Sequence, residues 1–175
     1  MNKAPWILGF VGIGILAALS GRGASMLGRF FTWAELSASE TATKTGLDNT
    51  IPQDKERALQ LLVAQILDPL RAALGVPVHI SSGFRSFEVN EAMHGSKGSQ
   101  HTLGEAADIW VDGLSAEDLA MVIHQLGLPY DQVIWYAPNR GGHVHVSFTE
   151  RRPNRTQGLH APTAGGYVPW SPWRV

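Results

Sequence analysis

Two short runs decide how this chain folds: SQHTLGEAAD, residues 99–108, and HVHVSF, residues 143–148. The second run alternates polar and apolar residues. If it forms a strand, its period of two places His143, His145 and Ser147 on one face and the apolar residues on the other. The apolar face is then buried while two imidazoles point into a shared space.

The first run brings a carboxylate to a buried position. A glycine lets the chain turn after His101, and residues 106–111 then form a mostly apolar, buried strand. A lone Asp108 carboxylate there is costly, and a divalent metal supplies the missing charge. Two histidines and one carboxylate leave the fourth zinc position for water, as in catalytic sites. We therefore predict His101, Asp108 and His145 as zinc ligands, with His143 nearby but not bound.

Three runs resemble the zinc D-alanyl-D-alanine carboxypeptidase and endolysin family of murein peptidases, which shares a metal-site fold with lysostaphin-type peptidases and hedgehog domains. They are SGFRS (82–86), SQH through Asp108 (99–108) and HVH (143–145). The resemblance covers roughly residues 31–150. It implies the same three zinc ligands, and a fold that holds them together.

The resemblance also implies roles around the metal. It makes His143 a proton-transfer or transition-state group and Arg85 a clamp for a substrate carbonyl or carboxylate, to which the guanidinium fork is suited. Some relatives carry a glutamate as general base three residues before the last zinc histidine, where this chain has Gly142. His143 takes that role by default. Ser99 and Gln100 are expected to shape the substrate cleft.

Other candidates for the site are weaker. We interpret three histidines outside the motifs as structural: His79 in an apolar strand, His124 on a helix and His160 near the end of the chain. His94 is an alternative ligand, because it precedes the first motif closely. Glu105 is a rival carboxylate, but strand parity separates it from the Asp108 side.

The pattern predicts an α+β fold: a small antiparallel sheet that carries the zinc site, with helices packed on one side. Thr32 and Glu35 have capping-box spacing, which predicts a short helix, and residues 37–51 read as a loop. Apolar spacing predicts a main helix over residues 52–75, kinked near Pro69. Further predicted elements are strands at 76–81, 106–111, 132–136 and 143–148 and helices at 86–93 and 115–126.

Composition predicts one catalytic domain with appendages. The 175 residues are 44% hydrophobic, enough for one ordinary core. We divide the chain into a hydrophobic segment and linker (1–30), a zinc peptidase domain (31–150) and an irregular tail (151–175). The net charge of −1 gives no sign of nucleic-acid binding. The sequence has no cysteine, so any metal site must use His, Asp or Glu.

The first 30 residues begin with an uncharged run, Trp6 to Ser20. At about 1.5 Å per residue a helix here spans roughly 22 Å, short of the ~30 Å hydrocarbon core of a bilayer. Three interpretations stay open: a signal peptide with a small-x-small cleavage site at residues 18–20, a weak membrane anchor of the kind that endolysins release, and a buried helix. The first two place the protein outside the cytoplasm or at the membrane.

The sequence thus predicts a zinc-dependent peptidase that hydrolyses a bond in the stem or cross-link of bacterial peptidoglycan. Both a D-Ala carboxy- or endopeptidase and an L-Ala-D-Glu endopeptidase fit, and so do phage lysis and envelope remodelling. The rival hypothesis is a non-catalytic or virion-associated module that binds murein. The complete ligand set of His101, Asp108 and His145 argues against it.

Overall fold

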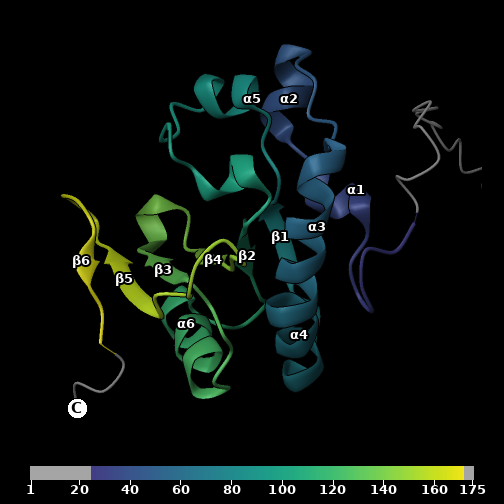
Figure 1. The fold of residues 1–175 in the computed structure, drawn as a ribbon. Helices are drawn as coiled ribbons and strands as arrows, with labels where there is room; N and C mark the ends of the chain where they lie inside the picture. The colour runs from purple at the N-terminus through teal and green to yellow at the C-terminus, as the bar shows by residue number, and fades with distance from the viewer. Residues whose placement is uncertain (1–24, 172–175) are drawn as a thin grey trace, which may run out of the picture.

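A six-stranded sheet organises residues 25–171, the part of the chain that this computed structural model describes (Figure 1). The order is β1-β2-β4-β3-β5-β6. Neighbours are antiparallel except β3 and β5, which are parallel. The strands are β1 (His79–Ser82), β2 (Ala106–Trp110), β3 (Gln132–Tyr136), β4 (Val144–Ser147), β5 (Gln157–Ala161) and β6 (Val168–Pro169).

Side-chain caps mark the starts of two predicted helices, α1 and α6. Thr32 accepts a hydrogen bond from the Glu35 amide at 3.2 Å, and the Glu35 carboxylate accepts one from the Thr32 amide at 2.7 Å, so the predicted capping box is confirmed. Ser115 caps α6 in the same position. The α-helices are α1 (Trp33–Ser37), α2 (Glu40–Thr45), α3 (Gln53–Leu62), α4 (Asp68–Leu74), α5 (Phe87–Ala92) and α6 (Ala116–Gln125).

The predicted main helix is interrupted before its proline. A π-helical turn, η1 (Val63–Leu67), joins α3 to α4, and Pro69 lies in the first turn of α4. Proline has no N–H, and its ring clashes with the carbonyl four residues earlier in a regular helix. The wider turn, in which the Asp68 amide donates to the Val63 carbonyl, lets the helix pass this point. The helix ends at Gly75 in a left-handed conformation, as predicted.

The hydrophobic core lies on one face of the sheet. Alternate residues of β2 and β4, among them Ile109 and Val146, are fully buried together with apolar side chains of α3 and α6. The residues between them, such as Asp108 and His145, lie on the opposite face because side chains alternate along a strand. One face therefore stabilises the fold, and the other is free to carry a polar site.

Two predictions of the fold need correction. Residues 151–175 were expected to be irregular, but 157–161 and 168–169 form β5 and β6, so the sheet is mixed. Neither strand shows a strong alternation of polar and apolar residues, because both are short and all their residues except Ala161 are half-buried or exposed. Within the predicted loop 37–51, residues 40–45 form α2, capped by Ser39 and supported by a Glu40–Lys44 pair. Its polar sequence has no apolar stripe that would predict a helix.

The predicted hydrophobic segment, residues 6–20, lies outside the described residues. Among residues 25–171, no helix combines the length and the apolar character that a membrane crossing requires.

Candidate metal centre

The cluster begins with a cross-strand pair at the middle of the sheet. Asp108 on β2 and His145 on β4 are register partners, and both are buried. The Nδ1 atom of His145 lies 3.1 Å from Oδ1 of Asp108. Neighbouring antiparallel strands hold such opposed side chains close together, so the sheet itself fixes this part of the site.

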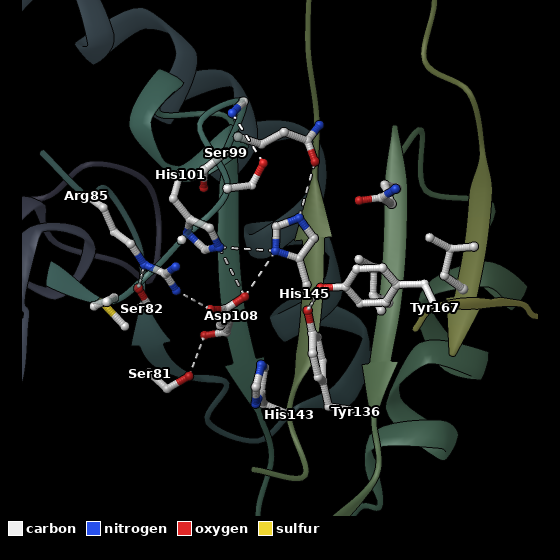
Figure 2. Close-up of a pocket in the computed structure, with 18 of the residues that line it drawn as sticks. Ser81, Ser82, Arg85, Ser99, His101, Asp108, Tyr136, His143, His145 and Tyr167 are labelled. Atoms are coloured by element: carbon white, nitrogen blue, oxygen red, sulfur yellow. Dashed lines mark hydrogen bonds and ion pairs between the residues drawn. The ribbon is translucent and has the colours of Figure 1, made fainter. Parts of the chain in front are cut away.

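His101 joins the pair from a short 3₁₀-helix, η2 (Gln100–Leu103), which ends at Gly104 in a left-handed conformation. Its Nε2 atom lies 3.1 Å from Nδ1 of His145 and 3.2 Å from Oδ1 of Asp108 (Figure 2). Its Nδ1 atom lies 2.7 Å from the carbonyl oxygen of Gly83. A carbonyl only accepts, so Nδ1 carries the proton and Nε2 presents a lone pair to the cluster.

The SGFRS run, residues 82–86, forms the wall behind His101. Gly83 lies so close to the end of α1 that a Cβ there would lie 2.4 Å from the Leu36 carbonyl oxygen, which explains the glycine. Arg85 follows and turns toward the cluster, where its Nη2 donates to Oδ2 of Asp108 at 2.6 Å and its Nε donates to Ser82 at 2.7 Å. Nη1 takes no part in these two bonds.

The electrostatics of the cluster fit a cation. Burial raises the pKa of the Asp108 carboxyl, but His101 and His145, when protonated, outweigh burial and hold that pKa well below its usual range. A bound cation would supply the same positive charge when both imidazoles are neutral. Burial lowers the pKa of His145, which favours the neutral imidazole that metals bind. One carboxylate oxygen and two imidazole nitrogens, all within 4.8 Å of one another, form a donor set suited to zinc.

His143 lies at the edge of this cluster, just before β4. Its ring stacks on Tyr136, with centroids 4.3 Å apart and planes 19° apart. Burial lowers its pKa, so the imidazole is neutral near pH 7. Gly141 has a φ of +102°, and a Cβ on it would lie 2.8 Å from Nδ1 of His143, so the turn needs a glycine at this place.

A cleft of about 630 Å³ opens over the cluster. The structure brings all the residues predicted for the site to this cleft: His101, Asp108, His145, His143, Arg85, Ser99 and Gln100. The Ser99 carbonyl accepts from Thr102, whereas both ends of the Gln100 amide are bonded within the protein. Tyr167 also lines the cleft, and its hydroxyl lies 3.0 Å from that of Tyr136.

The weaker candidates have other partners, as far as the described chain shows. Glu105 accepts hydrogen bonds from Arg151 and Thr149, on the side that strand parity predicted. The three histidines interpreted as structural make local contacts: His79 with Trp110 and Asp112, His124 with Tyr130, and His160 with Trp135. His94 lines the cleft but does not belong to the metal-ligating cluster.

Sequence reasoning did not find Tyr136, Tyr167 or Asp131. Tyr136 belongs to a predicted strand, and nothing in QVIWY distinguishes the side chain that faces His143. Tyr167 lies in the segment expected to be irregular. Asp131 directly precedes β3, where a carboxylate is usually a solvated turn residue, yet its side chain is completely buried. Only the arrangement in space reveals these three residues.

Comparison with models of known protein families identifies the relatives of this chain. A family model described as Peptidase M15 matches residues 29–147, which is more than half of the chain. No curated protein matches the chain. The match includes all three buried residues of the cluster together with Arg85 and His143, and it ends at the last residue of β4.

Proposed function

The chain belongs to the Peptidase M15 family, and from this premise we propose that it hydrolyses a peptide bond in the stem or cross-link of bacterial peptidoglycan. It is a zinc-dependent metallopeptidase, and peptidoglycan is the general substrate of its family. The observation that carries the proposal is the convergence of His101, Asp108 and His145 at the floor of an open cleft.

These three residues would hold the metal. Bound zinc supplies a Lewis acid that polarises a carbonyl oxygen and makes water acidic near neutral pH. The sheet holds two of the ligands in register, and the Gly83 carbonyl orients the third. Such prepositioned ligands need little rearrangement when the ion binds, and a cleft on one side leaves room for water and substrate.

The residues around the cluster would handle protons and developing charge. His143, neutral near pH 7, accepts a proton from the attacking water and returns it to the leaving amine. Tyr136 holds the His143 ring by stacking. Arg85 uses Nη1 to bind a carbonyl or carboxylate of the substrate, while its other nitrogens stay on Ser82 and Asp108.

We further propose that the enzyme acts outside the cytoplasmic membrane, in phage lysis or envelope remodelling. The uncharged run at residues 6–20 supports export or anchoring, and the substrate lies in the cell envelope. D-Ala carboxy- or endopeptidase and L-Ala-D-Glu endopeptidase activities are both compatible with an open cleft lined by an arginine and polar side chains.

Digestion of purified cell wall tests this function. The full chain is incubated with murein sacculi after chelation and again after zinc is restored, and the released fragments are identified by mass spectrometry. We expect new amino termini only with zinc, and the fragment masses identify the bond. Zinc-loaded protein that binds sacculi without releasing fragments would instead support the non-catalytic murein-binding module.

A further inference from the structure

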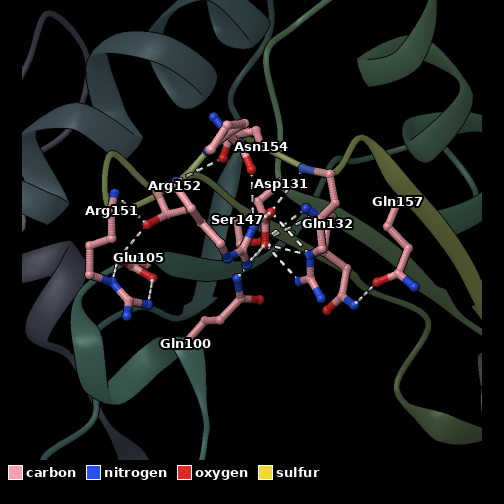
Figure 3. A network of polar contacts seen from close by, with 12 residues as sticks. Gln100, Glu105, Asp131, Gln132, Ser147, Arg151, Arg152, Asn154 and Gln157 are labelled. Carbon is pink, nitrogen blue, oxygen red and sulfur yellow. Dashed lines mark hydrogen bonds and ion pairs between the residues drawn. The ribbon is translucent and has the colours of Figure 1, made fainter.

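Gln100 lies between two buried groups and bonds to both. Its Oε1 atom lies 3.2 Å from Nε2 of His145. Its Nε2 atom donates to Oδ2 of Asp131 at 2.9 Å, as Figure 3 shows. The side chain therefore connects a residue of the metal cluster to a carboxylate that the cleft does not reach. The orientation of an amide and the tautomer of an imidazole follow from such contacts. Here Asp131 determines the orientation of the Gln100 amide, which in turn determines which nitrogen of His145 carries the proton.

The constraint starts at Asp131, which is an anion. Its side chain is completely buried, and its two oxygens accept hydrogen bonds from the guanidinium groups of Arg152 and Arg155 and from the Arg155 amide. A carboxylate with these donors stays ionised and only accepts hydrogen bonds. The group of Gln100 that faces it must therefore be the NH₂ group.

The amide orientation then decides the tautomer of His145. With its NH₂ group on Asp131, Gln100 turns its oxygen to His145, and that oxygen requires a proton on Nε2. We propose that Gln100, held by Asp131, is a positioning residue that keeps the proton of His145 on Nε2 and the lone pair of Nδ1 directed at the metal. This role is additional to the shaping of the cleft that the sequence predicts for Gln100.

The two histidines of the cluster are thus fixed in opposite tautomers. The Gly83 carbonyl keeps the proton of His101 on Nδ1, and Gln100 keeps that of His145 on Nε2. Outer contacts of this kind orient metal-binding histidines in many proteins. The inference rests on the proposed zinc centre, because its consequence is a lone pair offered to the ion.

The two arginines that hold Asp131 lie outside the region that matches the family model. Arg152 and Arg155 follow the end of the match at residue 147, and Arg155 lies two residues before the start of β5. Their guanidinium groups hold the Asp131 charge from the surface side, where each arginine side chain is less than half exposed. The C-terminal segment is therefore part of the metal centre's support.

Two substitutions of Gln100 test the proposal. Gln100→Met removes both polar ends at similar volume. Gln100→Glu keeps an acceptor for His145 and, because the Asp131 carboxylate raises its pKa, takes up a proton that it donates to Asp131 as the amide does. Zinc affinity is measured by competition with a chromogenic chelator. The tautomer of His145 is read from its ring ¹⁵N shifts in zinc-free, full-length protein that carries Asp108→Ala, because the Asp108 carboxylate otherwise competes for a proton on Nδ1. Gln157→Leu is the matched control, because the Gln157 side chain bonds to Gln132 and not to any of the three metal ligands.

We expect Gln100→Met to weaken zinc binding by about 10- to 100-fold and to populate both tautomers of His145. Gln100→Glu and Gln157→Leu should keep the Nε2–H tautomer. Their zinc affinity should stay within about threefold of the parent, a much smaller change than that expected for Gln100→Met. An unchanged tautomer and affinity in Gln100→Met would overturn the proposal. Failure of the parent chain to bind one zinc ion would overturn the proposed function instead, so the two failures are distinguishable.

Discussion

Two aspartates lie buried near the sheet, and they differ in what neutralises them. Both Asp108 and Asp131 have side chains shielded from solvent, and burial opposes the charge of each. Hydrogen bonds from Arg152 and Arg155 hold the pKa of Asp131 far below its usual range. Asp108 accepts a hydrogen bond from an arginine, Arg85, at Oδ2 alone, whereas its Oδ1 faces two imidazoles.

The difference separates a structural carboxylate from a functional one. Both oxygens of Asp131 are occupied by donors of the chain itself, so its charge is balanced without a ligand. Oδ1 of Asp108 instead meets the nitrogens of His101 and His145, which are metal-binding atoms when neutral. A buried carboxylate that turns one oxygen toward other acceptors and toward a cleft needs a cation, and this criterion identifies the site.

Substitution of Asp108 tests this comparison with the largest expected effect. Asp108→Asn keeps the shape but removes the charge, so we expect loss of bound zinc and a fall in murein hydrolysis of about 10³-fold or more, since the metal contributes several kcal/mol to transition-state stabilisation. Zinc content by mass spectrometry and fragment release measure the two effects. Asp112→Asn, on an exposed side chain paired with His79, is the control. Full activity of Asp108→Asn would contradict the assignment.

Substitution of His143 separates proton transfer from metal binding. His143 lines the cleft and stacks on Tyr136, but it is not part of the metal-ligating cluster. We expect His143→Ala to retain one zinc ion and to lose about 10²-fold or more in kcat, the usual contribution of a general acid or base. Unchanged kcat would remove His143 from the mechanism, and loss of zinc would make it a ligand.

The site residues could be predicted because their signals are local. The alternation of HVHVSF predicts which side chains of β4 face the cluster, and the glycine after His101 predicts the turn that precedes the Asp108 strand. Strand parity also separated Glu105 from the site, and the structure places it against Arg151. Period and turn chemistry are properties of neighbouring residues, so a sequence carries them directly.

The rest depends on contacts between distant segments. Asp131 reads as a turn residue until Arg152 and Arg155 are seen to cover it, 21 and 24 positions later in the chain. β5 forms because the backbone beside β3 has unpaired groups, which no side-chain pattern in QGLHA reveals. The π-helical turn before Pro69 likewise follows from a steric conflict whose resolution the sequence leaves open.

Substitution of Asp131 should affect stability first. Asp131→Asn leaves two arginines facing a neutral amide, and the resulting loss is about 1–3 kcal/mol in the free energy of unfolding, the usual cost of unsatisfied buried hydrogen-bonding groups. We expect a loss near the lower end of this range, because water partly solvates both arginine side chains. Urea denaturation of zinc-free protein measures it. An unchanged midpoint would mean that the buried carboxylate contributes nothing to the fold.

The same variant predicts a dependence on pH. The pKa of Asp131 is lower in the folded protein than in the unfolded chain, so its contribution is complete above the unfolded value near 4 and is lost as the pH falls below it. The difference in unfolding free energy between the parent and Asp131→Asn should therefore shrink between pH 7 and pH 3. A difference that grows toward acid pH would mean that Asp131 is not ionised in the fold.

Arg57 provides the exposed counterpart and the smallest expected effect. Its Nε and Nη2 bond to both oxygens of Glu150 at 2.6 and 2.7 Å, which resembles the arginine contacts of Asp131, but 72% of the Arg57 side chain is exposed. Water and salt screen such a pair. We expect the unfolding midpoint of Arg57→Ala to match that of the parent, in low and in high salt. A loss of unfolding free energy as large as that of Asp131→Asn would mean that two hydrogen bonds from an arginine stabilise a carboxylate even without burial. Burial would then not explain the difference between Glu150 and Asp131.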